Sequence, residues 1–175
     1  LMGSWPDEDK RERERPSRIE PGMLLGSFRI VERLGAGGMG EVFRAEHVYV
    51  PDRPAAIKVL KPERAAKGDF EKRFRSEASK LANLSKLKHP NIVEFYDANI
   101  QDGVAWIAME LLAGSSLDAI VLRQGRTSVP DALLLLSDAL DGLHAAHLCG
   151  LIHRDLKPAN LFLTTTGAVK LLDFG

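Results

Sequence analysis

The feature that most constrains the fold is a change in hydrophobic pattern near residue 113. Up to that point, short apolar runs bounded by turn residues indicate β-strands. These runs cover residues 27–34, 41–48, 54–60, 92–99 and 104–110. Residues 69–86 lie among them but carry apolar side chains at helical spacing. The first part of the chain therefore predicts a small α+β unit of five strands and one helix.

Beyond Ala113-Gly114 the pattern is mostly helical. Residues 117–124 predict a short amphipathic helix, and residues 131–148 predict a longer one that ends before Gly150. In the longer helix, one stripe at helical spacing is expected to face the core: Leu133, Leu136, Leu140, Leu143 and His147. Two short strand-like segments follow, at 159–163 and 168–172. This part predicts a mainly helical unit.

Composition and charge set limits on the class of function. The 175 residues contain 24 basic and 24 acidic side chains, so no net field favours nucleic acid or an anionic membrane. No apolar run reaches the ~20 residues that span a bilayer, and the charged residues 1–22 predict a disordered arm. The single cysteine, Cys149, fits a reducing compartment. We expect a cytoplasmic protein with no nucleic-acid or membrane contact by these residues, and a membrane anchor further downstream stays open.

A glycine-rich turn lies between the first two predicted strands. It reads Gly35-x-Gly37-x-x-Gly40. Glycines at such a turn let the backbone approach phosphate groups and offer its N–H groups to anionic oxygens. Taken alone the signal is weak, because three glycines in a hairpin usually mark only a turn. A dinucleotide site would need a helix directly after the glycines, and here a second strand follows.

Two charged residues occupy faces that should be buried. Lys58 lies in the apolar strand-like run 54–60, and Glu77 lies on the apolar stripe of the helix predicted over 69–86. An unpaired buried charge would cost about 3–5 kcal/mol, so the two residues are expected to neutralise each other. The alternative is a lysine on an edge strand and a glutamate on a helix rim. With the glycine turn upstream, a phosphate-contacting Lys58 oriented by Glu77 is the better interpretation.

The string His153-Arg-Asp-Leu-Lys-Pro-Ala-Asn160 is the most specific signal in the chain. An aspartate on a loop, here Asp155, can accept a proton from a hydroxyl group. The amide oxygen of Asn160 suits a hard cation, and Asp173 is a second oxygen ligand of the same kind, followed by Phe174 and Gly175. Either aspartate alone would more often be a turn residue, but the whole string is too specific for that.

These motifs, in this order and spacing, resemble the first part of a eukaryotic-like (Hanks-type) protein kinase domain, most similar to the bacterial serine/threonine kinases. The resemblance runs from about residue 27 to residue 175. It implies a bilobal α+β fold. Residues 23–112 would form the N-lobe and hinge, and 113–175 the first part of a helical C-lobe, truncated after the D-F-G motif.

The resemblance also implies ATP and Mg²⁺ as cofactors and assigns roles to single residues. Lys58 would hold the α- and β-phosphates and Glu77 would fix Lys58, while Lys157 would approach the γ-phosphate. Asp155 would be the catalytic base that orients the acceptor hydroxyl, and Asn160 and Asp173 would hold magnesium. The residues expected around the nucleotide are Leu34, Gly35, Ala36, Gly37, Gly38, Met39, Gly40, Glu41, Val42, Ala56, Lys58, Met109, Glu110, Leu112 and Phe162. A stacked apolar spine would join the lobes through Leu81, Phe95, His153 and Phe174.

The function implied is transfer of the ATP γ-phosphate to serine or threonine hydroxyls of a protein substrate. The alternative is a nucleotide-binding regulatory or pseudokinase-like module that acts through contact with a partner. A phosphotransferase for small molecules is disfavoured by Lys157 and the match of the whole catalytic loop. Because the pattern stops at Gly175, before any activation loop, we expect residues 1–175 alone to transfer little phosphate and to expose apolar surface that favours self-association.

Overall fold

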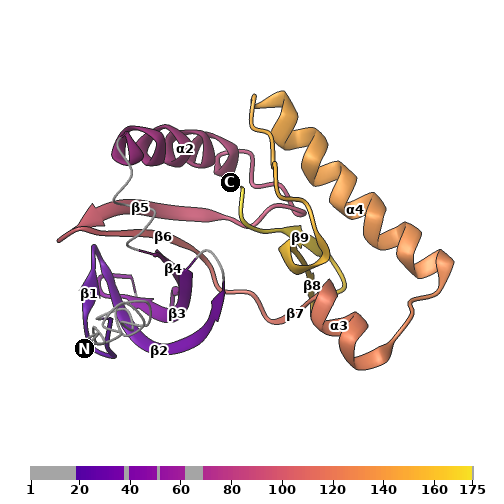
Figure 1. The fold of residues 1–175 in the computed structure, drawn as a ribbon, viewed down its shortest axis with the longest axis horizontal. Coiled ribbons are helices and arrows are strands. Elements are labelled where there is room, and N and C mark those ends of the chain that lie inside the picture. Colours follow the sequence, from indigo (N-terminus) through magenta and orange to yellow (C-terminus); the bar gives the residue numbers. More distant parts are fainter. Residues whose placement is uncertain (1–18, 38–39, 51, 62–68, 175) are drawn as a thin grey trace, which may run out of the picture.

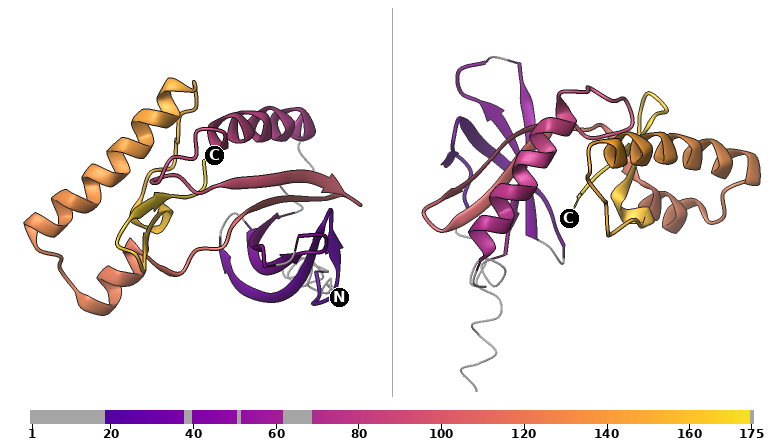
Figure 2. Two further views of the ribbon diagram at one scale, coloured as in Figure 1. Left: turned by 180° about the vertical axis from the view of Figure 1, so that it is seen from behind. Right: turned by 90° about the horizontal axis from the view of Figure 1, so that it is seen from above.

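The computed structural model describes residues 19–37, 40–50, 52–61 and 69–174. These residues form two parts that lie side by side (Figures 1 and 2). The elements, in chain order, are β1 (Leu24–Leu25), β2 (Phe28–Gly37), β3 (Gly40–His47), β4 (Pro54–Leu60), α2 (Phe70–Ser85), β5 (Phe95–Gln101), β6 (Val104–Glu110), β7 (Gly114–Ser116), α3 (Leu117–Gln124), α4 (Val129–Leu148), a 3-10 helix η3 (Pro158–Asn160), β8 (Leu161–Thr164) and β9 (Val169–Leu171).

The first part is built on an antiparallel sheet of six strands in the order β1-β2-β3-β4-β6-β5. The sequence predicted five strands. The sixth, β1, is two residues long and pairs Leu24 with Arg29 and Leu25 with Phe28. A strand of two residues shows no alternation, so the hydrophobic pattern could not reveal it. Strands β4 and β6 and helix α3 have the bounds that the pattern predicted.

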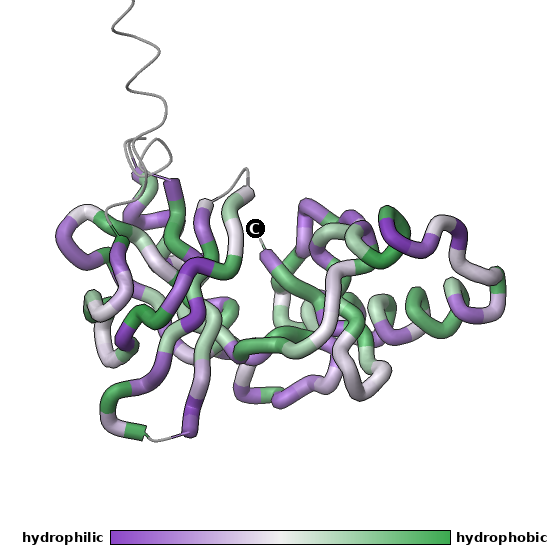
Figure 3. Tube along the Cα trace, turned by 90° about the horizontal axis from the view of Figure 1, so that it is seen from below, coloured by the Kyte–Doolittle hydropathy of each residue, from purple (hydrophilic) through white to green (hydrophobic). Residues whose placement is uncertain are grey.

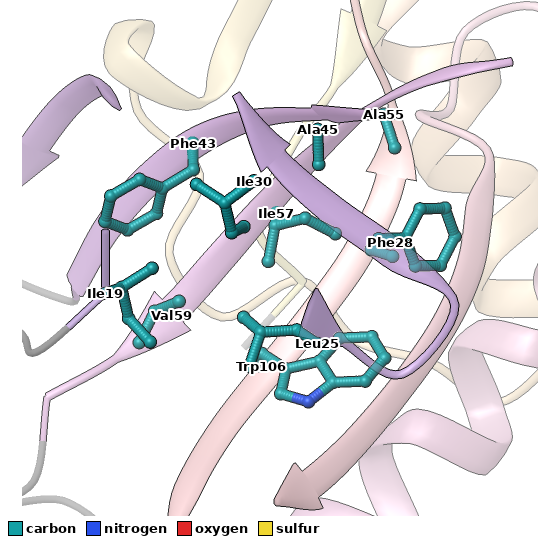
Figure 4. Close-up of a cluster of buried hydrophobic side chains, with 11 residues drawn as sticks. Ile19, Leu25, Phe28, Ile30, Phe43, Ala45, Ala55, Ile57, Val59 and Trp106 are labelled. Carbon is teal, nitrogen blue, oxygen red and sulfur yellow. The ribbon is translucent and has the colours of Figure 1, made fainter. Parts of the chain in front are cut away.

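Alternation along the strands gives this sheet one face packed on a core. Ile57 stands opposite Phe43 on one side and opposite Ala108 on the other, so the three side chains share a face. Figure 4 shows this face, where Trp106 lies next to Leu25 and is fully buried. Lys58 points to the opposite face, as predicted. Figure 3 shows hydrophobic and hydrophilic stretches in both parts of the chain.

The N-terminal boundary of the folded part lies earlier than the sequence indicated. Ile19 was assigned to the charged arm, yet it is only 8% exposed and packs in the core beside Val59 and Phe43. Gln101 holds the segment that follows, because its side chain accepts from the Gly26 N–H at 2.9 Å and donates to the Leu24 carbonyl at 3.3 Å. Residues 1–18 lie outside the described residues.

Helix α2 lies beside the sheet, over β5 and β6 (Figure 1). It begins one residue after Asp69 and ends at Ser85, close to its predicted span. The Ser85 hydroxyl accepts the Phe95 N–H at 2.8 Å and so ties the end of α2 to the start of β5. Leu84, near the same end, belongs to the core of the second part. Helix α2 therefore contributes to both parts of the molecule.

The second part packs α3 and α4 against a small antiparallel sheet in the order β7-β8-β9. Residues 92–94 were predicted as the start of a strand. Instead Ile92 forms a parallel bridge with Leu171, and β5 begins at Phe95. Helix α4 begins at Val129, two residues earlier than predicted, because the Ser128 hydroxyl accepts the Asp131 N–H at 3.2 Å.

The predicted buried stripe of α4 was wrong for all its members except Leu143, which is partly buried and packs against the core. Leu133, Leu136 and Leu140 are between 51% and 62% exposed, and His147 is exposed too. The face turned to the core instead carries small residues: Ala139, Gly142, Ala145 and Ala146. Leucine and alanine both repeat at helical spacing here, and close approach to β9 selects the smaller residues. No described helix is both long enough and apolar enough to cross a bilayer.

Gly142 sets the distance between α4 and its neighbours. A Cβ atom at this position would lie 2.7 Å from the Asn91 carbonyl oxygen and 2.9 Å from Leu171 Cδ1. Alanine normally stabilises a helix relative to glycine. Here we expect Gly142→Ala to lower the free energy of unfolding by about 1–3 kcal/mol, because the added carbon overpacks the contact. Urea denaturation measures the change, with Ser137→Ala on the exposed face of α4 as control. A stabilised Gly142→Ala variant would contradict this packing.

Candidate functional site

Lys58 lies at the centre of the candidate site. Its position on β4 is fixed by the pairing of β4 with β3 and β6, which places it opposite Val42 and Ile107. Its side chain is buried, and Nζ lies 2.6 Å from Asp173 Oδ1. The pair is a contact between the two parts of the fold, since Asp173 follows β9. A buried ammonium group held by a carboxylate is the arrangement expected of a charge that cannot reach water.

Glu77 was the predicted partner of Lys58. The structure pairs Glu77 with Lys80 at 3.2 Å, on the same helix. Ion pairs thus join Lys58 to Asp173 and Glu77 to Lys80, while Lys58 and Glu77 both line one cavity. An ion pair between Lys58 and Glu77 stays a prediction.

The loop before η3 gathers the next three predicted residues around one carboxylate. Lys157 Nζ donates to Asp155 Oδ2 at 2.7 Å. The Asn160 amide nitrogen donates to the Asp155 carbonyl oxygen at 2.8 Å and to Asp155 Oδ2 at 3.1 Å. Because both bonds use the amide nitrogen, the amide oxygen of Asn160 is the atom that can serve a cation. These contacts fix Asp155, Lys157 and Asn160 as one unit.

The electrostatics of this unit favour the ionised form of Asp155. The hydrogen bond from Lys157 is the largest cause that lowers the pKa of Asp155 below its ordinary value of 3.8, and the bond from Asn160 acts in the same direction. Partial desolvation opposes them. An aspartate with a lowered pKa is a weak base at neutral pH. The carboxylate is therefore suited to orient a hydroxyl group more than to remove its proton early.

The segment after β9 brings Asp173 next to this unit. The Leu172 N–H donates to the Asn160 carbonyl oxygen at 2.9 Å, and His153 Nε2 donates to the Leu172 carbonyl at 2.7 Å. The backbone of Asp173 has a left-handed φ of 52°, uncommon for a residue that is not glycine. Asp173 thus pairs with Lys58 and directly follows Leu172, whose backbone is bonded to that of Asn160, although these residues are far apart in the sequence.

The expected spine is present in part. The rings of His153 and Phe174 are in contact, with centroids 4.8 Å apart, and both residues are buried. Leu81 packs against the core cluster that contains Phe174, and Phe95 lines a cavity of about 400 Å³ together with these two residues. This cavity lies between α2 and the sheet, and Lys58, Asp173, Glu77 and Met109 also line it.

The glycine-rich turn has room for a ligand at two of its glycines. A Cβ atom at Gly35 or Gly37 would meet nothing within 4 Å, whereas one at Gly40 would lie 2.0 Å from the Val59 carbonyl oxygen. Gly40 therefore packs against β4, and Gly35 and Gly37 border open space. Arg33 and Glu41, on the two strands of the hairpin, form an ion pair at 2.9 Å. The predicted residues Gly38 and Met39 lie outside the described residues.

The remaining nucleotide residues come from both parts of the fold. Ala56 stands opposite Met109 on adjacent strands, so their side chains share the face that carries Lys58. Leu34 is exposed, and Ala36, Leu112 and Phe162 come from β2, the segment after β6, and β8. Phe162 pairs with Ser116 and Lys170 in the small sheet.

The side chain of Glu110 makes its contacts within the protein. It forms an ion pair with Lys170 of β9 and accepts the Glu94 N–H at 2.7 Å. Only its backbone could contact a base. Lys170 was not predicted, although like Lys58 it is a lysine within a short apolar strand.

Comparisons with known proteins agree with this geometry. A sequence model of the protein kinase domain matches residues 28–175. The chain belongs to the protein kinase domain family. It is 39% identical over 157 residues to serine/threonine-protein kinase PknA of Mycobacterium tuberculosis, which covers 87% of this chain and 36% of PknA. With PrkC of Bacillus subtilis it is 35% identical over 152 residues, covering 87% of this chain and 23% of PrkC.

The fold of this kinase domain also matches a solved relative. The crystal structure of the M. tuberculosis PknI kinase domain aligns with a TM-score of 0.80 at 34% identity, over 89% of this chain and 61% of that one. The family comparison confirms the predicted relation to bacterial serine/threonine kinases. The chain spans about a third or less of the length of these two curated relatives.

The contacts of Asp155 predict its titration. We expect Lys157→Met to raise the pKa of Asp155 toward 3.8, because the strongest hydrogen bond to its ionised form is lost. The favourable contacts of the carboxylate are present above the unfolded pKa and are lost as the pH falls through the lower folded pKa. Carboxyl ¹³C NMR measures the shift, with Lys157→Arg as the variant that keeps a donor. An Asp155 pKa that Lys157→Met leaves in place would contradict the assigned contact.

Proposed function

We propose that this kinase domain binds ATP with Mg²⁺ and, in the protein to which it belongs, transfers the γ-phosphate to serine or threonine hydroxyls of protein substrates. The observation that carries the proposal is the ion pair between Lys58 and Asp173, next to the bond that the Leu172 N–H donates to the Asn160 carbonyl oxygen. Lys58 also stands opposite Val42 of the glycine hairpin. Family membership supports the same reaction.

The donor set fits magnesium. Mg²⁺ binds oxygen ligands, commonly through one or two side chains together with substrate phosphates. The Asp173 carboxylate and the Asn160 amide oxygen are groups of this kind. The N–H of Leu172, the residue before Asp173, donates to the Asn160 carbonyl oxygen and so keeps the two backbone segments together. Asn160 and Asp173 would hold the ion. When bound, magnesium neutralises charge that develops on the transferred phosphoryl group.

The residues around this pair would position the triphosphate and its acceptor. The backbone of Gly35 and Gly37 borders open space where phosphate oxygens can approach. Lys58, held at Asp173, offers an ammonium group to the α- and β-phosphates. Lys157 extends from the same loop as Asp155 and would reach the γ-phosphate. Asp155 would orient the acceptor hydroxyl with its carboxylate.

The alternative, a regulatory or pseudokinase-like module, predicts nucleotide binding without phosphotransfer. Intact contacts among Asp155, Lys157 and Asn160 favour the enzyme, because a module without catalysis does not need them. Labelled ATP and a generic serine/threonine acceptor separate the two. In the enzyme, Asp155→Asn removes phosphotransfer but leaves nucleotide binding.

Lys58 provides the direct test of nucleotide binding. We expect Lys58→Met to weaken ATP binding in the presence of Mg²⁺ at least tenfold, about 1.4 kcal/mol, because the buried ammonium group is lost. Lys61→Met is the matched control, since Lys61 is exposed three residues further on. Isothermal titration calorimetry measures both, and unfolding temperatures check that both variants fold. Equal affinities of the two variants would overturn the assigned role of Lys58.

A further inference from the structure

Strand β9 is held by side chains at its first residue. Val169 is fully buried, and its N–H donates to Asp138 Oδ2 of helix α4 at 2.9 Å. Its carbonyl oxygen accepts the Asn91 Nδ2–H, also at 2.9 Å. Both peptide groups of one residue are thus satisfied by side chains from two other segments. Buried peptide groups need such partners.

The two side chains complete the outer edge of β9. One edge of the strand pairs with β8. Along the other edge, the Leu171 N–H donates to the Asn91 carbonyl at 2.9 Å, and the Val93 N–H donates to the Leu171 carbonyl at 3.1 Å. Asp138 and Asn91 extend this backbone ladder to Val169, where the main chain of 91–93 no longer reaches. Among the described contacts along this edge, Asp138 comes from α4, whereas the others come from Asn91 and Val93.

The strand leads directly to the candidate metal ligands. Leu172 follows β9, and its N–H donates to the Asn160 carbonyl oxygen. Asp173 comes next and pairs with Lys58. An extended strand keeps a nearly fixed length per residue, so a displacement of Val169 is transmitted to Leu172 and Asp173. Contacts from α4 thus bear on the position of Asp173 relative to Asn160.

We propose that Asp138 is a positioning residue of the metal site. Its carboxylate fixes the start of β9 and so holds Asp173 beside Asn160 and Lys58. This inference rests on the proposed function insofar as Asn160 and Asp173 bind Mg²⁺. Residues that orient metal ligands from outside typically change metal affinity by 10–100-fold when they are removed.

The test distinguishes an effect on metal binding from an effect on nucleotide binding. ATP affinity of the full chain is measured by calorimetry with Mg²⁺ and again with EDTA. We expect Asp138→Ala to weaken the affinity with Mg²⁺ about 10-fold and to leave the affinity in EDTA unchanged. Asp138→Asn keeps an oxygen that can accept the Val169 N–H, so we expect it to restore most of the binding. A purely structural role would lower both affinities together.

Asp141→Ala is the matched control. Asp141 has the same charge on the same helix but is exposed, and its removal should change neither affinity. If Asp138→Ala does not fold, Asp138→Glu replaces it, because the longer side chain displaces the accepting oxygen. Weakening of the Mg²⁺-dependent affinity by that variant supports the proposal. Unchanged Mg²⁺-dependent affinity in the folded variant overturns it.

A second measurement allows the role of Asp138 and the proposed function to fail separately. If the unaltered chain shows no ATP affinity that depends on Mg²⁺, the proposed function fails. The amide resonances of Leu172 and Asp173 in the ligand-free chain then decide the role of Asp138. Shifts in Asp138→Ala that are absent in Asp141→Ala support positioning, and unmoved resonances overturn it.

Discussion

The ion pair between Lys58 and Asp173 is the contact on which the arrangement of the site depends. Lys58 is fixed by the register of the six-stranded sheet, and Asp173 is fixed by β9 of the small sheet. Each part of the fold has its own core. A charge from each part meets the other at 2.6 Å, so neither part alone can form the site. Lys58 is buried, and a carboxylate at this distance stabilises a buried ammonium group.

A series of connected hydrogen bonds positions the Asp173 side of that pair. Asp138 and Asn91 hold Val169, β9 leads to Leu172, and Leu172 is bonded to Asn160 and His153. Asp155 in turn accepts hydrogen bonds from Lys157 and Asn160. Most of these bonds involve backbone groups on one side, which gives them a fixed geometry. The result is a set of carboxylate, amide and ammonium groups whose positions are fixed by contacts within the protein.

Sequence reasoning succeeded where a residue type was out of place. Lys58 in an apolar strand and the string from His153 to Asn160 marked the site, and alternation in β4 gave the correct face for Lys58. It failed where several residues satisfied the same pattern. In α4, leucines and small residues recur at the same spacing, and only packing against β9 decided that Ala139 and Gly142 face inward. The burial of Ile19 was not predicted, because a single apolar residue within a charged segment shows no periodic pattern.

The sequence by itself determined the family, the α+β class and the identity of the chemical groups, because these follow from residue types at fixed spacing. The tertiary structure decided which groups meet. It pairs Lys58 with Asp173 and Glu77 with Lys80. It also pairs Glu110 with Lys170 and places Asp138 where it accepts the Val169 N–H of β9. Partners of a charged side chain depend on distances between segments far apart in the chain, and those distances are set by the packing of the two cores.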